Sequence, residues 1–460
     1  MEDKKFLGTE PVGKLLFRLA VPTVTAQLIN MLYNVVDRIY IGHMPENGAL
    51  ALTGVGVCMP IIMIVTAFAA LVSSGGAPRA AIFMGANDYQ TAEKTLGNCF
   101  VTQILISLLL TAALLLWKRP LLLTFGASGN TIEYAVNYMQ IYAVGTIFVQ
   151  LTLGMNAFIT TQGFAKIGML SVLIGAVTNI ILDPIFIFGF GMGVRGAATA
   201  TVLSQALSCT WVLSFLCGKK SFIKIKRQNF RLDPKIILPC LALGTATFVM
   251  QGSESVISVC FNSSLLRYGG DIAVGAMTIL TSVMQFAMLP LQGLGQGAQP
   301  IISYNYGARN AARVKEAFQR LLKVSLCYSV LLWALLQIFP RGFAMLFTTD
   351  AALMDFTQSA LRIYCGMLFL FGIQIACQMT FTSLGRAKES IVVAVTRKFV
   401  LLLPLIYLMP RILTGNQTTA VYMAEPIADA LAVTFTVCLF VRQFKKALAR
   451  IEKKTTAGRA

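Results

Sequence analysis

Two apolar segments of this sequence each carry an aspartate, and these aspartates are the residues best placed to do chemistry. In "NIILDPIFIF" (179–188), Asn179 and Asp183 are four residues apart, so on a helix their side chains lie on one face. Pro184 has no backbone N–H, which leaves the carbonyl of Ile180 without its helical donor; a kink that only improves packing is the alternative role for this proline. An amide, a carboxylate and a free carbonyl suit a hard cation or a protonated carboxyl group. We therefore predict a cation or proton site here.

The second aspartate belongs to a polar stripe on the first apolar segment. Spacings of three and four residues place these side chains on one helical face: Thr23, Gln27, Asn30, Asn34 and Asp37, with Tyr33 and Tyr40 beside the aspartate. Polar residues within a membrane face the bundle interior or a water-filled cavity. For the amides, hydrogen bonds that only join helices are an equal alternative. For Asp37 we predict a function, because a neutral residue would join helices at lower cost.

The composition indicates that a membrane surrounds these segments. The 460 residues are 56% hydrophobic and 12% charged, about half of the ~25% charged residues usual in soluble domains. Helices of about 20 apolar residues span a bilayer, and we predict an all-α integral membrane protein with twelve such spans: 14–41, 50–75, 95–117, 134–162, 168–188, 193–217, 235–266, 272–300, 317–339, 356–384, 390–410 and 416–442.

The basic residues set the orientation of these spans. Of the 38 Lys and Arg residues, 28 fall in the segments that lie on the side of the N-terminus. Since basic residues concentrate in cytoplasmic loops, both termini are predicted to be cytoplasmic. The net charge of +19 has the same origin, and we expect no nucleic-acid partner. The ten cysteines form no CxxC pair and there is one histidine, so we expect no disulfide framework and no metal site beyond a coupling sodium ion.

The two halves of the chain repeat each other at a constant offset of 222 residues. The shift aligns Gly75 with Gly297 and Pro78 with Pro300, and it pairs the turns "GAND" (85–88) and "GARN" (307–310), whose glycines we interpret as helix caps or hinges. We predict two pseudo-symmetric six-helix lobes related by an axis along the membrane normal, with a cavity between them, in a monomer. The predicted divisions are an N-terminal lobe (1–217), a basic cytoplasmic linker (218–235), a C-terminal lobe (236–442) and a basic cytoplasmic tail (443–460).

Four segments carry a resemblance to a known family: "LAVPTVTAQLINMLYNVVDRIYIG" (19–42), "GGAPRAAIFMGANDYQTAEK" (75–94), "TNIILDPIFIFGFGMGVRGAATAT" (178–201) and "GQGAQPIISYNYGARNAARVKEA" (295–317). The chain resembles the multidrug and toxic compound extrusion (MATE) transporters, most closely their MepA-like branch. The resemblance implies an efflux antiporter in the cytoplasmic membrane of a bacterium. It would export amphipathic organic cations by alternating access, in exchange for protons or sodium ions, with no other cofactor.

The resemblance also implies which residues hold the coupling ion. The family places this network on two aspartates, an asparagine and a threonine, which correspond here to Asp37, Asp183, Asn179 and Thr201; we add Asn34 and Tyr33 as neighbours. Two carboxylates in a poorly solvated lobe will not both stay ionised without a cation. Protonation or sodium binding would neutralise the pair and let the first and fifth spans repack. The sequence does not decide between the two ions.

The second half lacks these aspartates and has other buried charges. Arg397 and Lys398 lie in the eleventh span, and Glu425 and Asp429 lie four residues apart in the twelfth. We predict a structural ion pair between Arg397 and Glu425, with a second coupling path as the alternative. Related sodium-driven transporters use a glutamate in the seventh span and an aspartate in the tenth; here Glu254 is present but the tenth span has no acid. We assign the following residues to the substrate cavity: Gln27, Asn30, Met155, Asn156, Gln251, Glu254 and Gln285.

The sequence also limits the other classes of function. No Walker motif, nucleophile elbow or HExxH is present, so we expect no enzyme. The alternative function is a flippase or exporter of a lipid-linked or anionic metabolite in the same superfamily. Such a protein would need basic residues along its cavity, and Arg362, Arg397 and Lys398 could supply them.

Overall fold

The computed structural model describes residues 5–45, 48–348 and 350–457, and every regular element in these ranges is helical. The first half contains α1 (Phe6–Thr9), α2 (Val12–Gly42), α3 (Gly48–Gly85), α4 (Tyr89–Thr124), α5 (Ile132–Thr161), α6 (Ala165–Pro184), η1 (Ile185–Gly189), α7 (Val194–Cys217) and η2 (Arg227–Asn229). The second half contains α8 (Pro234–Gly307), α9 (Ala311–Ile338), α10 (Pro340–Met345), α11 (Ala351–Tyr364), η3 (Leu368–Leu370), α12 (Phe371–Ser383), α13 (Ala387–Val395), η4 (Thr396–Leu402), α14 (Leu403–Ile412) and α15 (Gln417–Ala457).

These elements contain the twelve predicted spans, although several of the spans are not single α-helices. Within the described residues, ten helices are long and apolar enough to cross a membrane. The 74-residue α8 supplies two of the spans, because its direction changes at Gly270, where φ is 67° and ψ is −164°. A third irregular span consists of α11 and α12, which are bent by 44° across a short break. The first and second halves therefore contribute six spans each.

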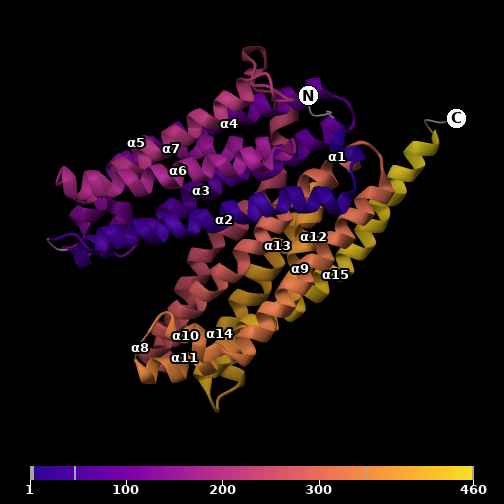
Figure 1. The fold of residues 1–460 in the computed structure, drawn as a ribbon. Helices are drawn as coiled ribbons and strands as arrows, with labels where there is room; N and C mark the ends of the chain where they lie inside the picture. Colours follow the sequence, from indigo (N-terminus) through magenta and orange to yellow (C-terminus); the bar gives the residue numbers. More distant parts are fainter. Residues whose placement is uncertain (1–4, 46–47, 349, 458–460) are drawn as a thin grey trace.

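The helices form two lobes that stay together at one end only. In Figure 1, α2–α7 and α8–α15 lie together near the two chain termini and diverge toward the opposite ends. The buried apolar residues follow the same division. One core cluster lies wholly within residues 41–198 and a second within residues 257–428, while a third joins both lobes and includes Leu19, Phe158, Ile302 and Phe381. The shared core therefore holds the lobes together near the termini.

Glycines on α3 and α8 let the backbones of the two lobes touch. A Cβ on Gly75 would overlap the carbonyl of Cys240, and one on Gly244 would overlap the carbonyl of Leu71. Gly85 and Gly307 have the same role at symmetry-related positions, and the left-handed residues of their turns are instead Asn87 (φ 60°) and Arg309 (φ 57°). We expected the two glycines to act as caps or hinges. The structure shows that their absent side chains allow close contact between the lobes.

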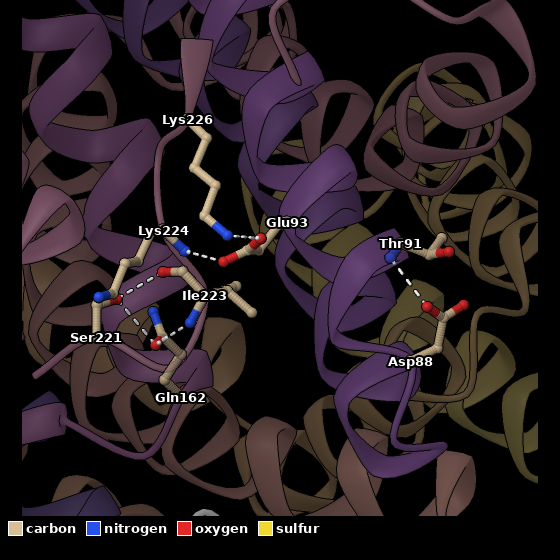
Figure 2. Close-up of polar contacts among 8 residues, drawn as sticks. All are labelled: Asp88, Thr91, Glu93, Gln162, Ser221, Ile223, Lys224 and Lys226. Carbon is tan, nitrogen blue, oxygen red and sulfur yellow. Dashed lines mark hydrogen bonds and ion pairs between the residues drawn. The ribbon is translucent and has the colours of Figure 1, made fainter. Parts of the chain in front are cut away.

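The basic segment between the lobes is bound to the first lobe rather than extended. Figure 2 shows Gln162 at the end of α5, where its side-chain oxygen accepts hydrogen bonds from the Ile223 backbone N–H (3.1 Å) and the Ser221 hydroxyl (3.0 Å). Glu93 of α4 forms an ion pair with Lys226 at 2.6 Å. Side chains from two helices of the first lobe thus fix the path of the linker before α8 begins.

Candidate functional site

The two aspartates of the first lobe lie together near the far ends of their helices. Asp37 is five residues before the end of α2, and Asp183 is the last residue but one of α6. These helices pack side by side, and the two carboxyl groups are within hydrogen-bonding reach of each other. After Pro184 the chain continues as the π-helical turn η1. The structure therefore brings together the two acids that the sequence singled out.

Asn179 and Thr201 complete the arrangement from α6 and α7. The Asn179 amide nitrogen lies 3.3 Å from Asp183 Oδ1 and 3.4 Å from Thr201 Oγ1, and it donates to both. The phenol of Tyr138, on α5, lies within hydrogen-bonding reach of the Thr201 hydroxyl. Helices α2, α5, α6 and α7 therefore all contribute a polar side chain to one site.

Three oxygen atoms of this site are buried without a hydrogen-bond partner among the described residues: Asp37 Oδ1, Asn179 Oδ1 and Asp183 Oδ2. The side chain of Asp183 is 0% exposed and that of Asn179 is 1% exposed. Leaving a buried acceptor unpaired costs free energy, and the cost is larger for a charged group. A carboxylate only accepts hydrogen bonds, so a proton or a cation is what this group of oxygens can bind.

The other predicted members of the site differ in how closely they approach the acids. Tyr33 lies one helical turn before Asp37 and close enough for its phenol to interact electrostatically with both carboxyl groups. Asn34 instead donates to the backbone oxygen of Asn30 at 2.6 Å, on its own helix. Tyr138 was not predicted, because a tyrosine in an apolar segment gives no sequence signal that separates a site residue from a packing residue.

The buried charges of the second lobe form a compact network. Arg397 donates to Glu425 Oε1 at 3.0 Å and to Asp429 Oδ1 at 2.8–2.9 Å, and it stacks over the Phe371 ring at 4.8 Å. The predicted ion pair between Arg397 and Glu425 is present, and Asp429 is an additional partner. Lys398 contacts Glu254 Oε1 of α8 at 2.7 Å. Every acid in this network therefore has a basic partner.

The residues predicted to line a substrate cavity fall into two groups. Asn30, Gln251, Glu254 and Gln285 are exposed in the structure, and Gln27 connects the lobes through a 3.2 Å hydrogen bond to Gln296. Met155 differs from this expectation because it is completely buried in the shared core. Asn156 donates to the Gly168 backbone oxygen at 3.2 Å. In this conformation four of the seven residues are thus exposed, Gln27 and Asn156 are half-buried, and Met155 is buried.

Comparison with known proteins identifies the class to which this fold and site belong. The MatE family model matches the chain twice, at residues 22–185 and 246–408, once in each half. The chain therefore belongs to the MATE family. It is a multi-pass membrane transporter and not an enzyme, as the sequence predicted.

The chain is also similar to individual proteins of this family, at low sequence identity. The multidrug export protein MepA of Staphylococcus aureus (strain N315) is 23% identical over 414 residues, which cover 89% of this chain and 90% of that protein. The solved structure of an outward-facing multidrug resistance MATE family transporter of the MOP superfamily has a TM-score of 0.90 at 24% identity, covering 97% of this chain and 99% of that one. A MOP superfamily transporter from Pyrococcus furiosus has a TM-score of 0.89 at 23% identity, with the same coverage. The structural likenesses confirm the predicted MATE-type fold.

Proposed function

We propose that this transporter is a secondary active antiporter, which exports amphipathic, mostly cationic organic compounds in exchange for protons or sodium ions. The observation that carries the proposal is the group of three unpartnered oxygens on Asp37, Asn179 and Asp183. Because the three unpartnered atoms are all acceptors, what they can bind is a proton or a small cation. The similarity to multidrug export proteins supports the class of substrate.

The conformation supports an exchange mechanism in which the site is loaded from outside. The lobes diverge at the ends opposite the termini (Figure 1), and the basic residues predict cytoplasmic termini. On this orientation the diverging ends of the lobes face the outside, and the acid pair lies in the outer part of the first lobe. A cation that enters there would neutralise the carboxyl groups and allow α2 and α6 to repack. Its release to the cytoplasm would restore the negative charge.

The ion pairs of the basic residues in the second lobe support the export of cations rather than anions. An exporter of a lipid-linked or anionic metabolite would need unpaired basic residues along the cavity. Arg397 and Lys398 are both neutralised, the first by Glu425 and Asp429 and the second by Glu254. Of the three basic residues considered for that alternative, only Arg362 has no ion pair within the described chain. The antiporter is therefore the better supported function.

The decisive experiment measures the uptake of a fluorescent lipophilic cation into everted membrane vesicles. A pH gradient and a sodium gradient are imposed separately, and the protein is wild type or Asp183→Asn. We expect the wild type to accumulate the dye under at least one gradient, which identifies the coupling ion. The Asp183→Asn variant should fall to the level of vesicles that lack the protein, because a neutral amide cannot exchange a proton or balance a cation.

A matched control tests whether the loss is specific to the site. Asp355 is an exposed aspartate on α11, far from the pair in the sequence, and Asp355→Asn makes the same chemical change. It should transport at the wild-type rate. Normal transport by Asp183→Asn under both gradients would show that the acid pair does not couple transport to an ion.

A further inference from the structure

An apolar groove of about 490 Å³ lies on the second lobe, between α9, α12 and α15. Its floor is an aromatic cluster in which the rings of Phe318, Phe440 and Phe444 have centroids 4.6–5.1 Å apart. Leu326, Ile373 and Val437 continue the apolar lining. All the lining residues belong to the second lobe, at whose outer edge α15 runs in Figure 1, so the groove is not formed between the lobes.

Two lysines stand at one end of this groove. Lys315 and Lys445 both line it, and both are exposed. Neither forms an ion pair with any residue that the structure describes. Lys315 is in the second turn of α9, and Lys445 follows the predicted end of the last span at residue 442. Both ammonium groups therefore lie at the predicted cytoplasmic surface of the membrane.

The length of the groove matches one leaflet of a bilayer. Leu326 follows Lys315 by eleven residues on α9, which corresponds to about 16 Å along the helix axis. The hydrocarbon core of a membrane is about 30 Å thick, so one leaflet contributes about 15 Å. A groove that starts at two ammonium groups and runs this far along apolar side chains has the dimensions of an acyl chain and its headgroup.

We propose that the groove binds an anionic phospholipid of the inner leaflet. Its phosphate lies between Lys315 and Lys445, and an acyl chain covers the aromatic floor. Basic residues at the cytoplasmic ends of membrane helices favour anionic headgroups. The same two lysines would repel a cationic transport substrate, which separates this groove from the transport path.

The experiment uses the full-length protein, purified in a neutral detergent, with phosphatidylglycerol as the probe. Native mass spectrometry measures the bound lipid as the lipid is titrated, and phosphatidylcholine is titrated in parallel. We expect selective binding of phosphatidylglycerol to the wild type. The double variant Lys315→Gln and Lys445→Gln should bind it roughly 30-fold more weakly, which is the loss expected for two lysine contacts at a membrane surface.

Two further variants separate this site from general surface charge. Lys323→Gln with Lys446→Gln removes the same charge from neighbouring exposed positions that do not line the groove, and it should bind phosphatidylglycerol as the wild type does. Val437→Trp fills the groove while both lysines stay, and it should weaken binding. The proposal is wrong if the Lys315 and Lys445 double variant or Val437→Trp keeps wild-type affinity. It is also wrong if both lipids bind equally, or if the groove is covered by a second copy in a lipid-free dimer.

Discussion

At the level of single residues, the two lobes hold buried charge in opposite ways. In the first lobe, Asp37 and Asp183 lie together and form no ion pair within the described chain. In the second lobe, Arg397 lies between two acids and is 8% exposed. A charge that already has its counter-charge gains little from binding an ion, whereas an uncompensated pair of acids needs one. The first cluster therefore fits the proposed coupling role, and the second fits a role in holding helices together.

The network around Arg397 predicts a particular pattern of mutant stability. Arg397→Met would leave Glu425 and Asp429 buried without a partner, a change that typically costs about 3–5 kcal/mol. We expect a large fall in the thermal midpoint of the purified protein, measured by the fluorescence of a thiol-reactive dye. The triple variant Arg397→Met, Glu425→Gln and Asp429→Asn has no unpaired charge and should recover most of this loss.

Transport by the same triple variant distinguishes a structural network from a second coupling path. If the network only stabilises α12–α15, the folded triple variant should still transport under the gradient that drives the wild type. A folded triple variant that does not transport would contradict the structural role. Lys398→Met removes the partner of Glu254 and serves as a separate comparison, because that acid is 56% exposed at its side chain and can be solvated.

Sequence could predict the acids of the first site but not all of its other members. Asn179 and Asp183 are one helical turn apart, and Asp37 is at a matching depth in a parallel span, so their meeting follows from helix geometry. Tyr138, on α5, lies near Thr201. Nothing in the sequence shows how α5 is rotated about its axis relative to α2 and α6. The sequence likewise did not show that Asp429 would be a partner of Arg397. Arg397 and Lys398 are adjacent residues, but their side chains point to different neighbouring helices.

At the level of elements, the apolar runs predict where the spans lie but not how they bend. All twelve predicted spans have a helical counterpart, because hydropathy summed over about 20 residues reports burial in lipid. The summed hydropathy does not depend on the backbone dihedral angles. It therefore does not show that α8 changes direction at Gly270, that α11 and α12 meet at a 44° bend, or that η1 and η4 are π-helical.

The repeat is visible in the caps of the helices that follow the two symmetry-related turns. The Asp88 side chain accepts from the Thr91 N–H at 3.0 Å at the start of α4, as Figure 2 shows, and Asn310 accepts from the Arg313 N–H at 3.2 Å at the start of α9. Caps of this kind contribute about 1 kcal/mol. Asp88→Ala and Asn310→Ala should therefore lower the thermal midpoint by similar amounts at neutral pH.

Only the first of these caps should depend on pH. Hydrogen bonds from the Thr91 hydroxyl and backbone N–H hold the pKa of Asp88 below its usual value. A lowered pKa in the folded state means that the stabilisation is present above the unfolded pKa of about 3.9 and is lost as the pH falls through the folded pKa. The decrease in thermal midpoint caused by Asp88→Ala should therefore become smaller as the pH is lowered into the acidic range. The decrease caused by Asn310→Ala should stay constant. Equal pH profiles for the two variants would contradict this account of the caps.

At the level of the whole molecule, the contact between the lobes is close but not obligatory. The lobes share one core near the termini, where glycines of α3 and α8 meet backbone carbonyls of the other lobe. Each lobe also keeps a core of its own at the diverging end. An assembly of this kind can separate at the shared contact without unfolding either lobe. This arrangement supports the proposed alternation between outward-open and inward-open states.

A pair of cysteines at this contact allows the alternation to be tested without adding any residue. Cys99 on α4 and Cys240 on α8 are completely buried, and their thiols are within hydrogen-bonding reach across the two lobes. Copper phenanthroline would take two electrons from the pair, release both protons and form one disulfide bond. That bond should hold the lobes in the present conformation, so dye uptake should stop and should return after reduction with dithiothreitol. Cys99→Ser should transport in the presence of the oxidant. Peptide mapping should confirm that the two cysteines are linked. If the linked protein still transports at the full rate, Cys99 and Cys240 do not separate during the cycle. The cytoplasmic side would then have to open between another pair of helices.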